Sequence, residues 1–376
     1  MEKRYALPLF VGGALAARTG DEMSGPALLL AGHALTGSAA GASALLAGIT
    51  VAAVVGGPVL GALLDRAGRP GRVLAWALVL YATGLGAILL GLGRWPFAVT
   101  LLVAVSAGLP APALSGGWTA QLPRVVASCR LPRANAYDAM TFGAAGLAGP
   151  ALAGAVAGVL GAPAALVVSA ALVVAAVPVA WTLPDQPGPH APVRAVPVLG
   201  DLAAGARAIA GRPALARATL VSALSCTAQG MLAACAVPLG EHVLGGAGRG
   251  ALLLTCAAAA ALTANAVLAR FPPPFAPDTV LRAAALVQAS ALVLAAPAGP
   301  ALLLGAVLLA GAAEGPQLTA VFAIRHRESP PRLRGQIFTT GAGVKLTGYA
   351  LGAAVAGPAA TWSLPGALLL AAGVSA

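Results

Sequence analysis

The chain has 376 residues, of which only 9% are charged and 59% are hydrophobic, and its formal net charge is +11. A soluble domain carries charge at about a quarter of its positions, so this composition excludes a soluble globular protein. We interpret the excess of basic residues as membrane-topology signals, and no nucleic-acid partner is expected.

The expected architecture is an all-α integral membrane protein with about 12 transmembrane helices. A helix needs about 20 apolar residues to cross a bilayer, so the length allows roughly ten to thirteen crossings. Runs such as 164–180 are apolar on every face, which favours helices over the alternating pattern of a barrel. In chain order, the expected spans are 6–32, 43–64, 73–92, 97–120, 138–160, 163–183, 217–239, 250–270, 280–297, 300–324, 336–357 and 361–376. The last span is short for a full crossing.

The basic residues test this arrangement, because short cytoplasmic loops hold the excess of Lys and Arg. With the N-terminus inside, 18 of the 22 basic residues fall on the inner side, two (Arg94 and Arg249) on the outer side, and two (Arg18 and Lys345) within spans. The pattern predicts a multi-pass protein of the cell (inner or plasma) membrane with both termini cytoplasmic. We expect a monomer.

The chain is expected to form two six-helix bundles, 1–183 and 217–376, joined by a cytoplasmic linker over 184–216. The linker begins with a Pro- and Gly-rich stretch and continues with a segment near 198–210 that is typical of an amphipathic surface helix. A shift of 199 residues aligns the fifth span with the eleventh, pairing Gly149 with Gly348 and Gly158 with Gly357. This weak repeat predicts pseudo-symmetric halves.

The first span carries three charged residues, Arg18, Asp21 and Glu22, whose spacing places them on one helix face. Charges at bilayer depth are costly and usually line a polar cavity or pair together. Arg18 can satisfy one carboxylate but hardly two, so the second acid is a candidate proton-coupling group. The alternative is an ion network that only locks helices together.

The loop after the second span contains the motif Gly61-Ala-Leu-Leu-Asp65-Arg66-Ala-Gly68-Arg69. Asp65 can accept hydrogen bonds from a helix N-terminus, and such a contact can be made in one conformation and broken in another. Here the chain resembles the major facilitator superfamily (MFS), whose loop signature is G-x-x-x-D-R-x-G-R. The resemblance implies two six-helix bundles, alternating access to a central site, and a role for Gly61, Asp65, Arg66, Gly68 and Arg69 as a conformational-switch loop.

The fifth span contains Gly146-Leu-Ala-Gly149-Pro150-Ala-Leu-Ala-Gly154, which is similar to the Gly-Pro motif that the family's exporters carry. Small-residue packing in a Gly-rich chain would explain the same residues (Gly146, Gly149, Pro150 and Gly154). Other features depart from the family pattern. Pro70 occupies the last basic position of the loop signature, the stretch 271–275 replaces its second-half counterpart, and the fourth span lacks an interior arginine.

Four polar residues of the second half complete the expected site. In the family, helices one, four, seven and ten line the cavity, which implies this role for Gln229, Glu314 and Gln317. Lys345 on the eleventh span is expected to act as a counter-ion. Together with Arg18, Asp21 and Glu22, they form the predicted proton-coupling or cavity set. Asp138 is expected to cap the start of the fifth helix.

An enzyme is not expected, because the sequence contains no phosphate-binding loop, nucleophile elbow or metal-ligand spacing. The chain therefore has no catalytic residue, no metal ligand and no cofactor among its expected features. The favoured function is export of a small organic molecule by proton antiport. Two alternatives stay open: uptake of a small metabolite by proton symport or facilitated diffusion, and a membrane sensor or scaffold that does not transport. The expected partners are the substrate, protons and the lipid bilayer.

Overall fold

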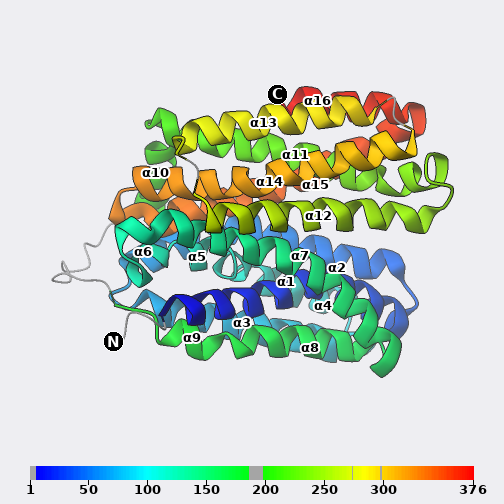
Figure 1. Cartoon of the computed structure of the whole chain (residues 1–376). Helices are drawn as coiled ribbons and strands as arrows, with labels where there is room; N and C mark the ends of the chain where they lie inside the picture. The colour runs from blue at the N-terminus through cyan, green and yellow to red at the C-terminus, as the bar shows by residue number, and fades with distance from the viewer. Residues whose placement is uncertain (1–5, 186–197, 273, 297–298) are drawn as a thin grey trace. The chain divides into compact units, whose positions relative to one another are not determined.

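The computed structural model describes residues 6–185, 198–272, 274–296 and 299–376 (Figure 1). Within these ranges all regular structure is helical. Most of the Pro- and Gly-rich part of the predicted linker, 186–197, lies outside the described residues, as do Lys3, Arg4 and Arg194 of the topology prediction.

The helices follow the predicted spans closely. The first half contains α1 (Ala6–Thr36), α2 (Ala39–Arg66), α3 (Pro70–Gly91), α4 (Phe97–Gly108), η2 (Ala111–Ala113), α5 (Gly116–Thr119), α6 (Leu122–Val125), η3 (Ser128–Arg130), α7 (Leu131–Leu160), α8 (Ala162–Ala175) and α9 (Val177–Trp181). The second half contains α10 (Val198–Ala210), α11 (Pro213–His242), α12 (Ala247–Arg270), α13 (Pro277–Ala295), α14 (Pro300–Glu328), η4 (Pro331–Leu333), α15 (Arg334–Trp362) and α16 (Leu364–Ser375).

Nine helical segments of the described chain are long and apolar enough to cross a membrane. Helices α1 and α15, which carry charged residues, and the short α16 complete the twelve predicted spans. Helix α16 has 12 residues, which at 1.5 Å per residue is a length of about 18 Å. The expected short last helix is therefore present.

Three predicted spans differ in detail from the observed helices: the fourth, the fifth, and the sixth, which is interrupted at Ala176 between α8 and α9. The fourth is not continuous, because α4 ends at Gly108 and short helical turns follow it. Pro110 and Pro112 lie at this break, and proline supplies no backbone N–H to continue a helix. The fifth begins at Leu131 rather than near 138, so Asp138 lies inside α7. The prediction that Asp138 caps this helix is wrong.

The chain divides into two compact units. Unit 1 comprises Met1–Leu131, Ala144–Ala208 and Ser329–Gly343, and unit 2 comprises Pro132–Gly143, Ile209–Glu328 and Val344–Ala376. The pair of six-helix bundles in chain order, 1–183 and 217–376, stays a prediction. The segment Val198–Ala210 is helical, as expected for the linker.

In unit 1, α1 packs along α8, α2 packs along α4, and α3 lies against both α4 and α8 (Figure 1). Small residues allow these close approaches. A Cβ atom at Gly20 of α1 would lie 2.7 Å from the backbone oxygen of Ser169 on α8. The Ser169 hydroxyl uses the same contact, donating a hydrogen bond of 2.6 Å to the Gly20 oxygen. The absence of a side chain at Gly20 thus lets a polar interhelical bond form.

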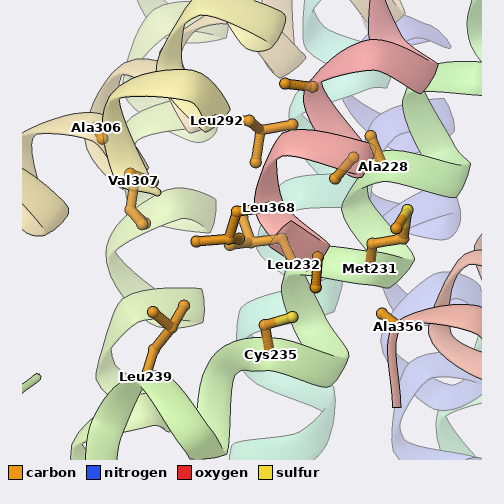
Figure 2. Packing of buried hydrophobic residues seen from close by; sticks show 14 of the residues in the cluster. Ala228, Met231, Leu232, Cys235, Leu239, Leu292, Ala306, Val307, Ala356 and Leu368 are labelled. Atoms are coloured by element: carbon orange, nitrogen blue, oxygen red, sulfur yellow. The ribbon is translucent and has the colours of Figure 1, made fainter. Parts of the chain in front are cut away.

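In unit 2, α14 packs between α12 and α13, and α11 packs against α12 and α16. Leucines from five helices form its apolar core, including Leu232 and Leu239 of α11, Leu292 of α13 and Leu368 of α16 (Figure 2). The short α16 therefore contributes buried side chains to the core in spite of its length.

Candidate functional site

Asp21 of α1 belongs to a hydrogen-bond network between α1 and α3. The Tyr81 hydroxyl donates to Oδ1 of Asp21 at 2.7 Å. The Ser24 hydroxyl lies 2.9 Å from the Tyr81 oxygen and donates to the backbone oxygen of Asp21 at 2.7 Å. Tyr81 is 1% exposed and Ser24 is 5% exposed. The carboxylate of Asp21 is thus held in place by a neutral hydroxyl group.

Arg18 binds the interrupted fourth span. Its Nε donates to the Leu114 oxygen at 3.2 Å, and its Nη2 donates to Oγ1 of Thr119 at 2.9 Å. A helix break leaves carbonyl groups without intrahelical donors, and a guanidinium can satisfy several of them at once. Arg18 also attracts the Asp21 carboxylate electrostatically. Its hydrogen bonds to Leu114 and Thr119 in the fourth span were not predicted from the sequence.

Glu22 differs from its neighbour in exposure. Its side chain is exposed, whereas Asp21 is half-buried and Arg18 is buried. All three belong to unit 1, and Tyr81 is near enough to both acids to interact with each of them electrostatically. The structure brings the two predicted helix-one acids together around Tyr81, whereas Arg18 binds the fourth span.

Asp65 of the switch loop binds the start of α15 within unit 1. Its Oδ1 accepts a hydrogen bond from the Gly335 N–H at 2.7 Å, and its Oδ2 accepts one from the Gln336 N–H at 2.9 Å. The first N–H groups of a helix have no intrahelical partner and favour a negative charge. Gly61 lies one turn before Asp65, and a Cβ atom there would overlap the Gln336 backbone. Gly61 therefore allows α15 to approach the carboxylate.

Two arginines lie close to this carboxylate. Partial burial lowers the pKa of Arg124 and of Arg334 below the usual arginine range, and attraction to Asp65 opposes the shift in both cases. Asp65 thus compensates two positive charges as well as two N–H groups. Of the other loop residues, Arg66 ends α2 and Gly68 lies in the turn, while the Arg69 side chain instead faces Asp185, with Nε 3.6 Å from Oδ2.

The Gly-Pro motif lies within α7, and its glycines are not equivalent. A Cβ atom at Gly149 would lie 2.6 Å from the Glu22 Cβ and 2.8 Å from the Met23 nitrogen on α1. A Cβ atom at Gly146 or Gly154 would meet no atom within 4 Å among the described residues. Pro150 lies inside the continuous helix. Only Gly149 provides a close helix contact, and that contact is with the backbone that carries the α1 acids.

The predicted polar residues of the second half all lie in unit 2. The Gln317 amide on α14 donates to the Ser225 hydroxyl on α11 at 2.7 Å. Gln229 is one turn further along α11 and is half-buried. Glu314 and Lys345 are near enough to attract each other, as the expected counter-ion role of Lys345 requires. These residues are distributed over three helices of one unit.

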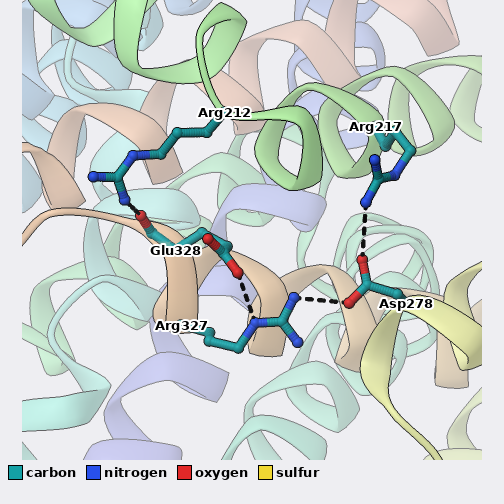
Figure 3. A network of polar contacts seen from close by, with 5 residues as sticks. All are labelled: Arg212, Arg217, Asp278, Arg327 and Glu328. Atoms are coloured by element: carbon teal, nitrogen blue, oxygen red, sulfur yellow. Dashed lines mark hydrogen bonds and ion pairs between the residues drawn. The ribbon is translucent and has the colours of Figure 1, made fainter.

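Unit 2 also contains an ion-pair network that was not predicted from the sequence (Figure 3). Asp278, in the first turn of α13, contacts Arg327 of α14 at 2.7 Å and Arg217 of α11 at 3.5 Å. Arg327 also binds the Glu328 carboxylate at 2.8 Å, and Arg212 donates to the backbone oxygen of Glu328. Asp278 therefore joins the ends of three helices. An acid directly after Pro277 at a predicted helix start was the only sequence signal for this role.

Comparison with known proteins gives a family and a fold. The model of the Major Facilitator Superfamily matches residues 10–357. No curated protein sequence matches the chain. Among solved structures, the chain is similar to the human organic anion transporter MFSD10 (TETRAN), with a TM-score of 0.80 and 17% identity over 100% of this chain and 98% of that one.

Two bacterial structures are also similar. A homologue of the iron transporter ferroportin in an outward-facing state gives a TM-score of 0.78 and 17% identity over 98% of each chain. The fucose:proton symporter FucP of E. coli gives a TM-score of 0.75 and 17% identity over 100% of this chain and 97% of that one. At this identity the likeness shows the fold alone. Because the family model spans nearly the whole chain, the protein belongs to the Major Facilitator Superfamily and is a multi-pass membrane transporter rather than an enzyme.

Proposed function

We propose that this transporter exports a small organic molecule in exchange for protons, with Asp21 as the principal proton-binding group. The observation that carries the proposal is the surroundings of Asp21. Its carboxylate accepts a hydrogen bond from the neutral Tyr81 hydroxyl, while Arg18 directs donors to Leu114 and Thr119. A hydroxyl can bond to a carboxylate and to a carboxylic acid, so this network tolerates both protonation states.

The contact between Asp65 and α15 supplies the second part of the mechanism. In the proposed cycle this contact forms in one conformation and breaks in the other, as alternating access requires. A hydrogen bond to a charged group contributes about 1.5–3 kcal/mol, so two of them are large enough to bias a conformational equilibrium. Proton binding at Asp21 would favour one conformation and substrate binding the other.

The substrate is expected to be a small, amphipathic or cationic organic molecule. In the interiors of the predicted spans, away from their ends, the acids Asp21, Glu22 and Glu314 outnumber the cations Arg18 and Lys345. Aromatic residues form only 4% of the chain, which does not favour stacking of large polycyclic compounds. The panel of probes should nevertheless include an organic anion and a sugar, the solute types of two of the structural neighbours.

The sign of the proton movement tests the proposal. The purified protein is reconstituted in liposomes that contain a pH-sensitive dye, without an initial pH gradient, and each probe is added outside. The probes are the organic cation ethidium, the organic anion p-aminohippurate and the sugar fucose. Antiport moves protons out as substrate enters, so we expect the lumen to become alkaline, whatever the orientation of the protein.

The alternatives give different results in the same assay. Symport would acidify the lumen, and facilitated diffusion would let a labelled probe enter without a pH change. Either result would contradict proton antiport and support the uptake hypothesis. A sensor or scaffold would give neither proton flux nor probe entry, with these probes or with any compound of a wider panel.

A further inference from the structure

A recess of unit 1 lies outside the network around Asp21 and outside the contact of Asp65 with α15. It lies between the start of α3 and the segment that follows α9, and its volume is about 430 Å³. Cavities of this size fall within the range that binds small ligands or parts of larger ones. The residues that line it are Arg69, Arg72, Trp181, Leu183, Pro184 and Asp185.

The recess carries an excess of positive charge. Arg69 faces Asp185, with 3.6 Å between Nε and Oδ2, but both side chains are more than half exposed, so the pair is weak. The Arg72 guanidinium lies over the Trp181 ring, 5.2 Å from its centroid. This cation–π contact holds the guanidinium in place and leaves its in-plane N–H donors available to an anion.

Two tryptophans place the recess at the edge of the membrane. Trp76 and Trp181 pack edge to face, with ring centroids 6.4 Å apart, and are 59% and 45% exposed. Tryptophan is enriched at the membrane–water interface, where its ring lies at headgroup depth. One turn beyond Trp76 on α3, Leu80 is 61% exposed, as a side chain that faces lipid would be. The arginines of the recess thus lie next to exposed apolar side chains, as the charged headgroup of a phospholipid lies next to its acyl chains.

We propose that this recess binds the phosphate headgroup of an anionic glycerophospholipid. Arg69 and Arg72 donate to the phosphate oxygens, while Trp181 and Trp76 lie against the glycerol and the first carbons of the acyl chains. Asp185 competes with the phosphate for Arg69. Removing this carboxylate should therefore strengthen lipid binding, whereas removing a guanidinium should weaken it.

The test is native mass spectrometry of the full chain in detergent, titrated with dioctanoyl phosphatidylglycerol and separately with dioctanoyl phosphatidylcholine. Phosphatidylglycerol should bind more tightly than phosphatidylcholine. Arg72→Gln should weaken phosphatidylglycerol binding by about fivefold, the usual contribution of one arginine near an anionic surface. The matched control, Arg94→Gln, removes an exposed arginine after the other end of α3 and should leave binding unchanged.

Two more variants make the result decisive. Asp185→Asn should strengthen phosphatidylglycerol binding, and a misfolded protein could not show this gain. Trp181→Leu should weaken binding, whereas Trp362→Leu, at a residue that is 92% exposed on α15, should not. Equal binding of both lipids, or equal effects of Arg72→Gln and Arg94→Gln, would overturn the proposal. Displacement of the lipid by an equal concentration of inorganic phosphate would also overturn it, because the site would then recognise a soluble anion.

Discussion

At the scale of single residues, polar side chains of unit 1 form hydrogen bonds with backbone oxygens as well as with one another. Arg18 satisfies oxygens at the break in the fourth span, and Ser169 binds the backbone of Gly20. Such bonds matter in a lipid environment, because unpaired polar groups there have no water to replace them. Tyr81 is the member of the α1–α3 network that can be tested most simply.

Removing the Tyr81 hydroxyl should destabilise the protein measurably. Tyr81→Phe removes the hydroxyl that donates to the Asp21 carboxylate and lies beside the Ser24 hydroxyl, and we expect a loss of about 1–3 kcal/mol in the free energy of unfolding. Chemical unfolding in mixed micelles measures this loss. Thr83→Val is the matched control, because the exposed Thr83 hydroxyl binds only oxygens of its own helix among the described residues. Equal stability of the two variants would contradict the network.

The sequence could supply the ionisable residues of this network but not their partners. Arg18, Asp21 and Glu22 were found because charges inside an apolar run are rare. Tyr81 lies 60 positions from Asp21, and no local spacing relates the two residues. The bonds of Arg18 to the fourth span were equally hidden, because they depend on where Pro110 and Pro112 interrupt that helix.

At the scale of helices, glycine positions decide which pairs approach closely. The glycines of the α7 motif look alike in sequence, yet among the described residues only Gly149 lies against another helix backbone. The spacing of small residues therefore predicts that close packing occurs but not which residue provides it. The start of α7 was missed for a related reason: Arg133, Asn135 and Asp138 are polar, so the apolar pattern begins later than the helix.

Alanine substitutions along α7 should have opposite effects on stability. Gly149→Ala places a methyl group 2.6–2.8 Å from α1, and overpacking of this kind costs about 1–3 kcal/mol. Gly154→Ala is the control, because open space surrounds that position among the described residues and alanine is a better helix former than glycine. Thermal unfolding in detergent should show a lower midpoint for the first variant and an equal or higher one for the second. Equal midpoints would indicate that α1 and α7 do not pack as described.

The ion network of unit 2 should contribute modestly and depend on salt. Asp278→Asn weakens contacts to Arg217 and Arg327, but these arginine side chains are 50% and 46% exposed, so solvent screens the interaction. We expect a loss of about 1 kcal/mol in the free energy of unfolding at low ionic strength, measured by chemical unfolding in lipid-free detergent. This loss should shrink in concentrated salt. Asp185→Asn, which removes a more exposed pair, should cost less in the same lipid-free detergent. A loss that does not change with salt would contradict an electrostatic origin.

At the scale of the whole molecule, the sequence was most informative where composition and charge act together. Twelve spans and the short last helix followed from apolar runs and from the placement of Lys and Arg. The motif around Asp65 indicated the family, which the family comparison confirms. Its partner could not be predicted, because Gly335 is 270 positions away and offers only a backbone N–H, which no side-chain pattern reveals.

The contact between Asp65 and α15 should protect the start of that helix. Asp65→Asn removes the negative charge and one of the two acceptor oxygens, so the amides of Gly335 and Gln336 should exchange hydrogen faster. Hydrogen-exchange mass spectrometry of a peptide covering 334–338 measures the effect. Asp278→Asn changes an acid of unit 2 and should leave this peptide unaffected. Unchanged exchange after Asp65→Asn would remove the proposed switch contact.

Proton coupling through the acids of α1 is the central claim, and one comparison of two transport modes tests it most directly. In liposomes containing the Asp21→Asn plus Glu22→Gln variant, uptake driven by a pH gradient is compared with exchange of labelled for unlabelled substrate without a gradient, using the probe that drives proton flux in the wild type. Exchange requires substrate binding and alternating access but no net proton movement. We predict that the variant retains exchange and loses gradient-driven uptake. Gradient-driven uptake at the wild-type rate would contradict proton coupling by these two residues.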